Sequence, residues 1–493
     1  MESKINRITD ILRRDDGISG AMHYTEQISW ILFLKFLNDL EETKNEDAQL
    51  DGEVYNYILE EKYRWGIWAV PKKDGKIDLL NSKSGDDLLE FVNKELFPYL
   101  KSFKNITENP KSIKYKIGAI FEFLDNRIAN GHTLREILDI IDDMDFHNQS
   151  DLFQLSLIYE KLLKDMGSDG GNSGEFYTPR PLIKVMVDVL DPEVGQTIYD
   201  PAVGSCGFLI EAYNHIRYVD IKENKQRDLS VEQLKFLNED TFFGNEKTPL
   251  SYVMGVMNMI LHGVESPNIA KTNTLTKDIR GLEEKDRYDC ILANPPFGGK
   301  EKDQIQQNFP IKSNATELLF LQHMMNSLKL GGKCAVVIPE GVLFQTNNAF
   351  QSVKKDLLER FNVHTILSLP SGVFLPYSGV KTNVIFFDRV GSTSDIYYYE
   401  VNPPYKLTKN KPINYEHFKE FLQNWKTREL TENSWIVKKD EIKDFDISAK
   451  NPNKNEDIVH KSPIELVENI KDNNKEINDL MDEIEMILIG KDI

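Results

Sequence analysis

The chain has 493 residues, which is too many for one ordinary hydrophobic core, so two or three domains are expected. A composition of 40% hydrophobic and 10% aromatic residues excludes a disordered or fibrous protein. The formal net charge of −19 argues against a protein that grips a nucleic-acid duplex by itself, because neutralising phosphates takes a basic face. A local basic patch is still compatible with this total.

The sequence carries none of the marks of a membrane or secreted protein. No run of about 20 uncharged apolar residues occurs, and the amino terminus lacks the apolar core of a signal peptide. Cys206, Cys290 and Cys334 lie far apart without metal-ligand spacing, which predicts free thiols rather than disulfides or a zinc site. We therefore expect a protein of the cytoplasm, with no membrane contact and no bound metal.

Residues 1–165 are predicted to form a helical domain. Apolar residues recur at helical spacing, as at Ile28, Ile31 and Leu32. Pro71 and the turn that follows it interrupt the pattern, so separate helices joined by loops are expected. Nothing in this region indicates chemistry, which favours a structural or docking role.

Residues 166–400 are predicted to form a doubly wound α/β domain of Rossmann-like type, with a mostly parallel sheet. A glycine- and serine-rich linker opens the region, and short apolar runs then alternate with helical stretches. The expected strands are 197–200, 241–244, 290–293, 333–338, 365–369 and 383–388. The expected helices are 181–190, 208–217, 250–262, 316–328 and 349–361.

Residues 401–493 are predicted to be a polar, turn-rich extension with a helical tail. Apolar residues in the tail alternate by three and four, with one polar position, at Val467, Ile470, Asn474, Ile477, Met481, Ile484 and Leu488. This heptad pattern favours a helix that docks on a partner helix, and a single polar residue in such a seam often sets register. An ordinary amphipathic surface helix is the alternative.

Two sequence elements could hold a small ligand. The first is a strand, glycine turn and helix that contains Asp200, Gly204 and Gly207 and lacks the dinucleotide-binding glycine pattern. A carboxylate at that strand end would repel a pyrophosphate but can bind an ammonium group, which favours a ligand with an amino-acid end over NAD. The second is Glu246, after the next strand, where a carboxylate can accept both hydroxyls of a ribose. Taken alone, Glu246 would more often be a solvated residue.

The third element is the tetrapeptide Asn294, Pro295, Pro296 and Phe297, at the end of the apolar run 290–293. Strand ends of this kind line the ligand-binding edge of open α/β sheets. The Asn294 side-chain oxygen and the Pro295 carbonyl can accept the two hydrogens of an exocyclic amine, and the prolines fix the carbonyl in place. Phe297 can stack on a flat base. The tetrapeptide therefore predicts a grip for an amino-bearing base.

Further motifs surround these elements. They are the segment 174–180 (Gly-Glu-Phe-Tyr-Thr-Pro-Arg), the Asp-Pro-Ala turn from residue 200, the helix segment 257–263, the strand segment 331–339 and the helical tail. With these motifs the chain resembles S-adenosyl-L-methionine-dependent amino-methyltransferases. More narrowly, it resembles the modification subunit of type I restriction–modification systems, which methylates adenine N6 in DNA. The resemblance covers most of the chain.

The resemblance implies a role for each matching residue. Those expected at the methionine end of the cofactor are Glu175, Phe176, Tyr177, Thr178, Pro179 and Arg180, and those expected to wrap it are Gly204, Ser205, Cys206 and Gly207. Asp200 should face the cofactor's amino end, Glu246 its ribose and Asn273 its adenine, while residues 294–297 should take a flipped DNA adenine. Cys206 departs from the family's glycine or alanine, which implies a tighter turn or a shifted cofactor. Asn273 stands where aspartate is frequent, which makes its assignment weaker.

The resemblance also implies partners. The chain has no Walker A loop, so translocation and cleavage would belong to a separate restriction subunit. Little sequence is left for reading DNA, so a specificity subunit, shared by two modification subunits, would select the site. Methylation of cytosine C5 would need a cysteine nucleophile, and Cys290 lies inside an expected strand.

Two other functions stay open from the residues alone. One is an amino-methyltransferase that acts on RNA or on protein glutamine and shares the Asn-Pro-Pro grip. Phe297 in place of tyrosine, together with the large helical domain, argues against it. The other is an assembly subunit that binds cofactor without turnover, against which the intact tetrapeptide argues.

Overall fold

The computed structural model describes residues 2–144 apart from 74, 75, 79 and 108, then 146, 159, 161–162, and 178–453 apart from 222, 224, 265, 376 and 377. In the tail it describes residues 471, 473–475, 477–478 and 480–481. The chain divides into two compact units, Met1–Lys450 and Asn451–Ile493. None of the described helices is long and apolar enough to cross a membrane.

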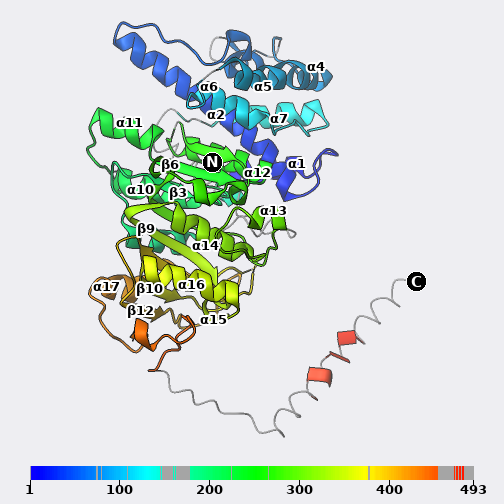
Figure 1. Ribbon diagram of the computed structural model, residues 1–493. Helices are drawn as coiled ribbons and strands as arrows, with labels where there is room; N and C mark the ends of the chain where they lie inside the picture. Colours follow the sequence, from blue (N-terminus) through cyan, green and yellow to red (C-terminus); the bar gives the residue numbers. More distant parts are fainter. Residues whose placement is uncertain are drawn as a thin grey trace. The chain divides into compact units, whose positions relative to one another are not determined.

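The amino-terminal region is helical, as predicted, and its helices gather on one side of the sheet (blue to cyan in Figure 1). The apolar residues predicted to share a helical face, Ile28, Ile31 and Leu32, are fully buried. The elements are α1 (Glu2–Leu12), α2 (Ala21–Leu50), α3 (Trp65–Trp68), β1 (Lys72–Lys73), β2 (Lys76–Ile77), α4 (Gly85–Phe91), a π-helical turn (Val92–Leu96), α5 (Phe97–Ile106), α6 (Ile113–Phe121) and α7 (Gly131–Asp142).

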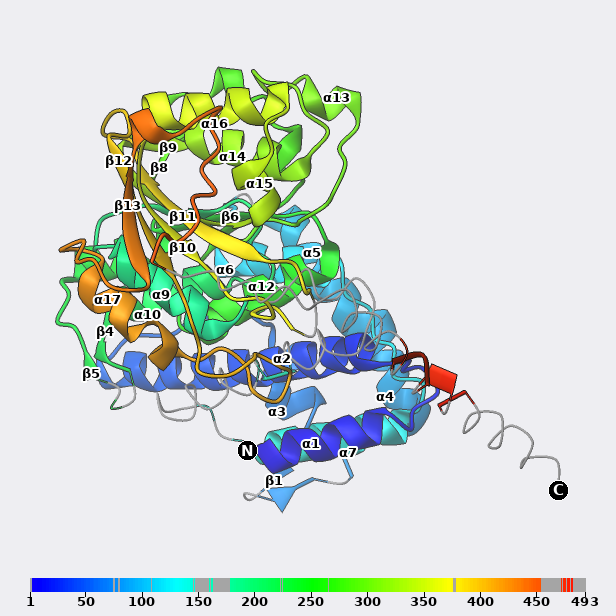
Figure 2. The ribbon, with the colours of Figure 1, turned by 90° about the horizontal axis from the view of Figure 1, so that it is seen from below.

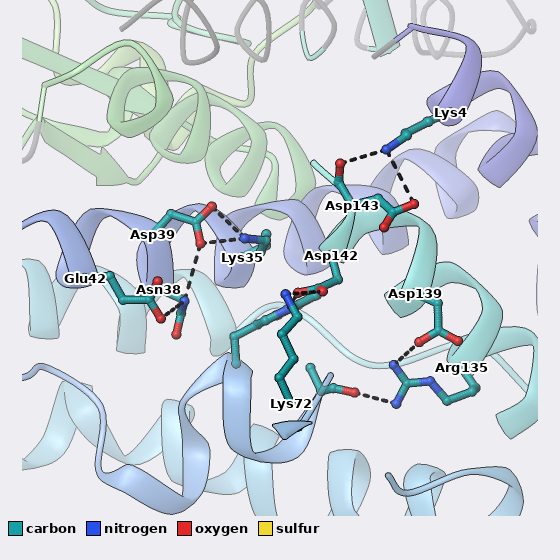
Figure 3. Close-up of polar contacts among 12 residues, drawn as sticks. Lys4, Lys35, Asn38, Asp39, Glu42, Lys72, Arg135, Asp139, Asp142 and Asp143 are labelled. Atoms are coloured by element: carbon teal, nitrogen blue, oxygen red, sulfur yellow. Dashed lines mark hydrogen bonds and ion pairs between the residues drawn. The ribbon is translucent and has the colours of Figure 1, made fainter. Parts of the chain in front are cut away.

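Several polar pairs lie within and between the amino-terminal elements (Figure 3). Lys35 Nζ lies 2.6 Å and 2.7 Å from the two carboxylate oxygens of Asp39, one turn further along α2. The Phe146 backbone N–H donates to Asp39 at 3.2 Å, and Lys72 Nζ pairs with Asp142 at 2.7 Å. Because an unpaired buried charge is costly, Lys35 and Asp39 within α2 depend on each other. The separate Lys72–Asp142 pair, in which Lys72 is half exposed, joins β1 to α7.

The second region is built on a nine-stranded sheet in the order β13-β12-β10-β11-β9-β8-β3-β6-β7. β11 and β13 run against the other strands, so the sheet is mostly parallel, as predicted. The strands are β3 (Ile198–Asp200), β6 (Phe242–Glu246), β7 (Asn268–Lys271), β8 (Tyr288–Ala293), β9 (Leu328–Pro339), β10 (Asn362–Ser368), β11 (Thr382–Asp388), β12 (Asp395–Glu400) and β13 (Ser434–Lys438).

Helices cover both faces of this sheet, and Figure 2 shows the layers. One face carries α9 (Arg180–Leu190), α10 (Gly207–Arg217) and α12 (Pro249–Leu261); the other carries α14 (Thr316–Asn326) and α16 (Asn348–Arg360). The core on the α12 face is continuous with the core of the amino-terminal helices. Successive strands move from β3 to β6 and β7, and the chain then returns to β8 on the other side of β3. The carboxyl ends of β3 and β8 therefore form the switch point at which such sheets bind ligands.

The sequence prediction missed some elements. β7, β12 and β13 were not expected, and β13 extends the sheet into the segment 401–493. β7 and β13 are short edge strands with one exposed side, so they carry little hydrophobic pattern. The smaller elements are the hairpin β4 (Tyr218–Asp220) and β5 (Lys225–Gln226), α11 (Val231–Glu239), α13 (Asp303–Gln306), α15 (Glu340–Phe344) and α17 (Lys419–Asn424).

The second unit contains the predicted docking helix. The residues described between 471 and 481 are helical, and Ile477 and Met481 are 52% and 63% exposed. Val467, Ile470, Ile484 and Leu488 lie outside the described residues, as do the linker and the predicted boundary near residue 165. The docking role and the domain boundaries stay predictions.

Candidate active site

Asn294 lies at the carboxyl end of β8 with one side-chain atom free for a ligand. Its Nδ2 donates to Thr178 Oγ1 at 3.0 Å, just ahead of α9. Its Oδ1 is buried and accepts no hydrogen bond from the part of the chain that the structure describes. Buried polar atoms are nearly always paired, so this oxygen is suited to an N–H donor from a bound molecule. Pro295, which follows, is buried and holds the chain with a fixed φ.

Phe297 is half-buried beside these acceptors and meets a second ring that the sequence did not indicate. Phe374, in the loop between β10 and β11, lies edge-on to it, with ring centroids 6.4 Å apart and planes at 90°. Phe374 is 5% exposed, so the contact holds Phe297 in a defined orientation. Two segments distant in sequence form this contact, so no local sequence motif predicts it.

The glycine turn after β3 has the backbone that its sequence predicts. Gly204 has a φ of 50°, and Gly207 begins α10. A methyl group at Gly207 would lie 2.9 Å from the Ile183 side chain and 3.1 Å from Arg180 Nη1. Arg180 Nη1 donates to the Gly207 carbonyl at 3.1 Å. Arg180, the last residue of the predicted segment and the first of α9, is therefore joined to the turn.

Cys206 adopts an unusual conformation within this turn. Its φ of 63° is left-handed, a region that glycine enters more easily, and its side chain is fully buried. Burial raises the pKa of the Cys206 thiol well above its usual range. Cys206 is thus a packing residue in the protein as described, rather than a nucleophile.

Helix α12 supports the turn from beneath, which the sequence did not reveal. Asn258 Nδ2 donates to the Ser205 carbonyl at 2.9 Å. A methyl group at Gly255 would lie 2.7 Å from the Gly204 carbonyl oxygen and 2.8 Å from Cys206 Sγ. The sequence indicated Asn258 only as part of the segment 257–263. Its hydrogen bond to the Ser205 carbonyl could be recognised only in the folded structure.

Two carboxylates lie at the turn, as predicted. The pKa of Asp200 is raised to about 8, mainly by burial and in smaller part by the Glu246 charge, against the hydrogen bond from the Ala202 backbone N–H, which lowers it. Glu246 is 7% exposed and accepts the backbone N–H of Gly204 at 3.0 Å and of Thr248 at 2.7 Å. Two acids held close together fit a positively charged ligand.

The remaining predicted residues divide into two groups. Asn273 Oδ1 accepts the Leu275 N–H at 3.1 Å, and the neighbouring Thr274 hydroxyl donates to the Pro201 carbonyl, so this segment packs against the turn. Glu175, Phe176 and Tyr177 lie outside the described residues. No group of three potential metal ligands occurs within the described residues.

Comparisons with known proteins agree with this geometry. The chain matches the N-6 DNA Methylase family over residues 148–461 and the HsdM N-terminal domain over residues 1–143. The type I restriction enzyme EcoEI methylase subunit of Escherichia coli is 35% identical over 99% of this chain and 97% of its own length. The EcoKI methylase subunit of Escherichia coli (strain K12) is 30% identical over 85% and 74%.

Solved structures share the fold. A type I modification subunit from Vibrio vulnificus YJ016 has a TM-score of 0.82 and 36% identity, over 93% of this chain and 99% of that one. A chain from a study of complex assembly and conformational transition in a type I restriction–modification system has a TM-score of 0.77 and 40% identity. That match covers 100% of this chain and 98% of the other.

Proposed function

Because this chain belongs to the N-6 DNA methylase family, as a type I modification subunit, we propose that residues 294–297 hold the adenine for methyl transfer from S-adenosylmethionine. The observation that carries the proposal is the buried, unpartnered Asn294 Oδ1, named above for the described residues. It faces no protein donor there and stands at the switch point of the sheet.

The base side of the reaction depends on positioning. The target adenine leaves the duplex, which costs a few kcal/mol, and enters the site. Asn294 Oδ1 and the Pro295 carbonyl accept the two amine hydrogens, which turns the nitrogen lone pair toward the methyl donor. Phe297, held edge-on by Phe374, stacks on the base. Neither acceptor is a strong base, so most of the acceleration comes from orientation.

The cofactor side uses the glycine turn and its carboxylates. S-adenosylmethionine supplies an electrophilic methyl group when it is bound. Asp200 would pair with its amino end, Glu246 would accept its ribose hydroxyls, and Asn273 would face its adenine. Thr178 to Arg180 would line its methionine end. Gly204 to Gly207 allow close approach of the backbone.

Chemistry through a cysteine is disfavoured in this site. Cys290 is the cysteine nearest to the tetrapeptide in sequence, and it lies inside β8 at 1% exposure. Burial raises the pKa of its thiol to about 12, so it would not ionise near neutral pH. Direct transfer to an exocyclic amine needs no such nucleophile.

Target choice belongs to a partner in this proposal. With a net charge of −19, the chain is poorly suited to hold a duplex alone, so a specificity subunit would select the site. Two modification subunits would share one specificity subunit, and a separate restriction subunit would cut. A relative of 40% identity comes from a study of such complex assembly.

Labelled S-adenosylmethionine tests the proposal directly. The chain, with and without its specificity subunit, is incubated with DNA, RNA and protein, and the methylated product is identified. N6-methyladenine in DNA, dependent on the specificity subunit, is the expected result. Label in RNA or in protein glutamine would contradict the proposal and support the first alternative function. Cofactor binding without any methyl transfer would support the second, an assembly subunit without turnover.

A further inference from the structure

A short loop of this acidic chain is strongly basic. Residues 401–414 contain Lys406, Lys409 and Lys411 and no aspartate or glutamate, although acids outnumber bases by 79 to 60 in the whole sequence. All three lysines are exposed. Within the described ranges, none of them forms an ion pair with a carboxylate. Their charges are therefore available to an external anion.

The loop has a defined conformation. The Thr408 N–H donates to the Lys411 carbonyl at 3.1 Å, and the Lys411 N–H donates to the Thr408 carbonyl at the same distance. Leu407 and Ile413, on either side of this turn, are 2% and 3% exposed and anchor it in the core. We call residues 406–411 the basic turn. Because it is already ordered, little conformational entropy would be lost when it binds.

The basic turn lies at the same sheet edge as the active site. β12 runs parallel to β10, and both run in the direction of β8, so the chain leaves β12 at the edge where residues 294–297 lie. A methyl group at Gly372 would lie 3.3 Å from the Leu407 carbonyl oxygen. The loop that contains Gly372 also contains Phe374, which contacts Phe297. The loop between β10 and β11 thus contacts both the basic turn and the tetrapeptide 294–297.

The strand order gives the distance between them. Four strand-to-strand steps separate β8 from β12. At about 4.8 Å per step, the end of β12 lies roughly 19 Å from the end of β8, and the basic turn begins six residues further along the chain.

We propose that the basic turn binds the phosphate backbone of the substrate DNA beside the flipped adenine. The inference rests on the proposed function, because it takes residues 294–297 as the place of the adenine. Phosphate contacts of this kind position a protein without reading sequence. The turn would therefore set the duplex against the catalytic edge after the specificity subunit has chosen the site.

The test uses the complex assembled with the specificity subunit. A triple variant, Lys406→Gln with Lys409→Gln and Lys411→Gln, is compared with wild type by DNA binding across a range of salt concentrations. The matched control is the triple variant Lys235→Gln with Lys285→Gln and Lys438→Gln. These lysines are exposed and lie near the amino ends of the parallel strands, away from the carboxyl ends where the active site lies. The control changes the net charge by the same amount. Duplexes with and without the recognition site are both titrated.

Weaker binding that is independent of sequence is expected. The Kd of the basic-turn variant should rise about tenfold on both duplexes, and the slope of log K against log salt should fall by about 3, at roughly 0.9 per lost phosphate contact. Turnover at saturating DNA and the Kd for S-adenosylmethionine should stay at wild-type values, and the control should change little.

Three results would overturn the inference. The first is a salt slope equal to that of the control variant, and the second is a loss of DNA affinity confined to the duplex with the recognition site. The third is loss of the specificity subunit on co-purification, which would assign the turn to a protein partner. The proposed function fails by a different result, absence of N6-methyladenine from the wild-type complex. The binding slopes are measured independently of that product.

Discussion

At the scale of single residues, one hydrogen bond holds the side-chain amide of Asn294. Asn294 Nδ2 donates to Thr178 Oγ1 at 3.0 Å, which leaves Oδ1 for the target amine. If the amide were turned around, it would present two N–H donors to an amine that also donates. Thr178, expected only to line the cofactor, thus becomes a positioning residue for Asn294 in our account.

Thr178→Val should lower kcat about 10- to 100-fold, because an orienting hydrogen bond of roughly 1–3 kcal/mol is lost. Thr178→Ser keeps the hydroxyl and should restore most of the rate. Steady-state kinetics, together with cofactor titration, separate the two possible roles. A valine variant that loses cofactor affinity as strongly as turnover would make Thr178 a cofactor ligand instead.

Asp200 predicts how cofactor affinity depends on pH. Its pKa is raised to about 8 in the free protein by burial, and an adjacent ammonium group would lower it. Binding then releases a proton below pH 8, so affinity should rise from about pH 5 to 8, by up to tenfold per pH unit. Above that range the ligand's own α-amino group, with a pKa of about 8, loses its charge and affinity should fall.

Calorimetric titration of wild type and Asp200→Asn over this pH range checks the prediction. The asparagine variant should bind more weakly at pH 8 and show little dependence between pH 5 and 7. An equally steep rise in the variant would show that another group titrates.

The sequence could predict which residues meet at the candidate site but not the residues that support them. Asp200, Glu246 and Asn294 follow predicted parallel strands, and such strand ends meet at one edge by geometry alone. Asn258 and Phe374 act through tertiary contacts, with Ser205 and with Phe297, that no spacing encodes. They could be recognised only after the helices and loops were placed.

At the scale of elements, α12 links two regions of the chain. One side contacts the amino-terminal helices, where Tyr159 donates to Met254 Sδ at 3.0 Å and Ser29 Oγ lies 3.3 Å from the same sulfur. Another side supports the glycine turn through Gly255 and Asn258. Contacts on several sides explain why this helix is apolar almost all round, since every residue from Ser251 to Leu261 is buried.

Gly255→Ala should disturb the glycine turn. The added methyl group would overlap the Gly204 carbonyl oxygen and Cys206 Sγ, which should destabilise the fold by about 1–3 kcal/mol and raise the cofactor Kd about tenfold. Thermal unfolding and cofactor titration measure both effects. Gly66→Ala, in α3 with open space around it, is the control and should leave both unchanged. Normal cofactor binding in the Gly255 variant would contradict the supporting role of α12.

The fold was predictable where elements are buried and regular. All six predicted strands and all five predicted helices of the α/β region are present, because each has a continuous apolar face or a clear turn at its ends. β7 and β13 were not predicted, because edge strands need few apolar residues. Their place in the sheet follows from tertiary pairing rather than from local pattern.

At the scale of the whole molecule, the acidic chain needs a partner, and the tail is the expected contact. Replacing Ile477 and Met481 by Asp should release the specificity subunit, because it places charges on the exposed apolar face of the helix. Cofactor binding should persist, since these residues belong to the separate second unit. Co-purification and cofactor titration measure the two outcomes.

The control places Asp at Lys475 and Asn478, which lie off that face and are also exposed. The control should keep its partner. If the Ile477 and Met481 variant also kept it, docking would occur through another surface.

The central claim, that Asn294 holds the target amine, is tested most directly by Asn294→Ala in the complex with the specificity subunit. Transfer of labelled methyl groups to DNA and the Kd for S-adenosylmethionine are measured on the same preparation. Our account predicts that N6-methyladenine formation is abolished while the cofactor Kd stays within about threefold of wild type, because the amide contacts the base and not the cofactor. Retained transfer in the alanine variant would contradict it.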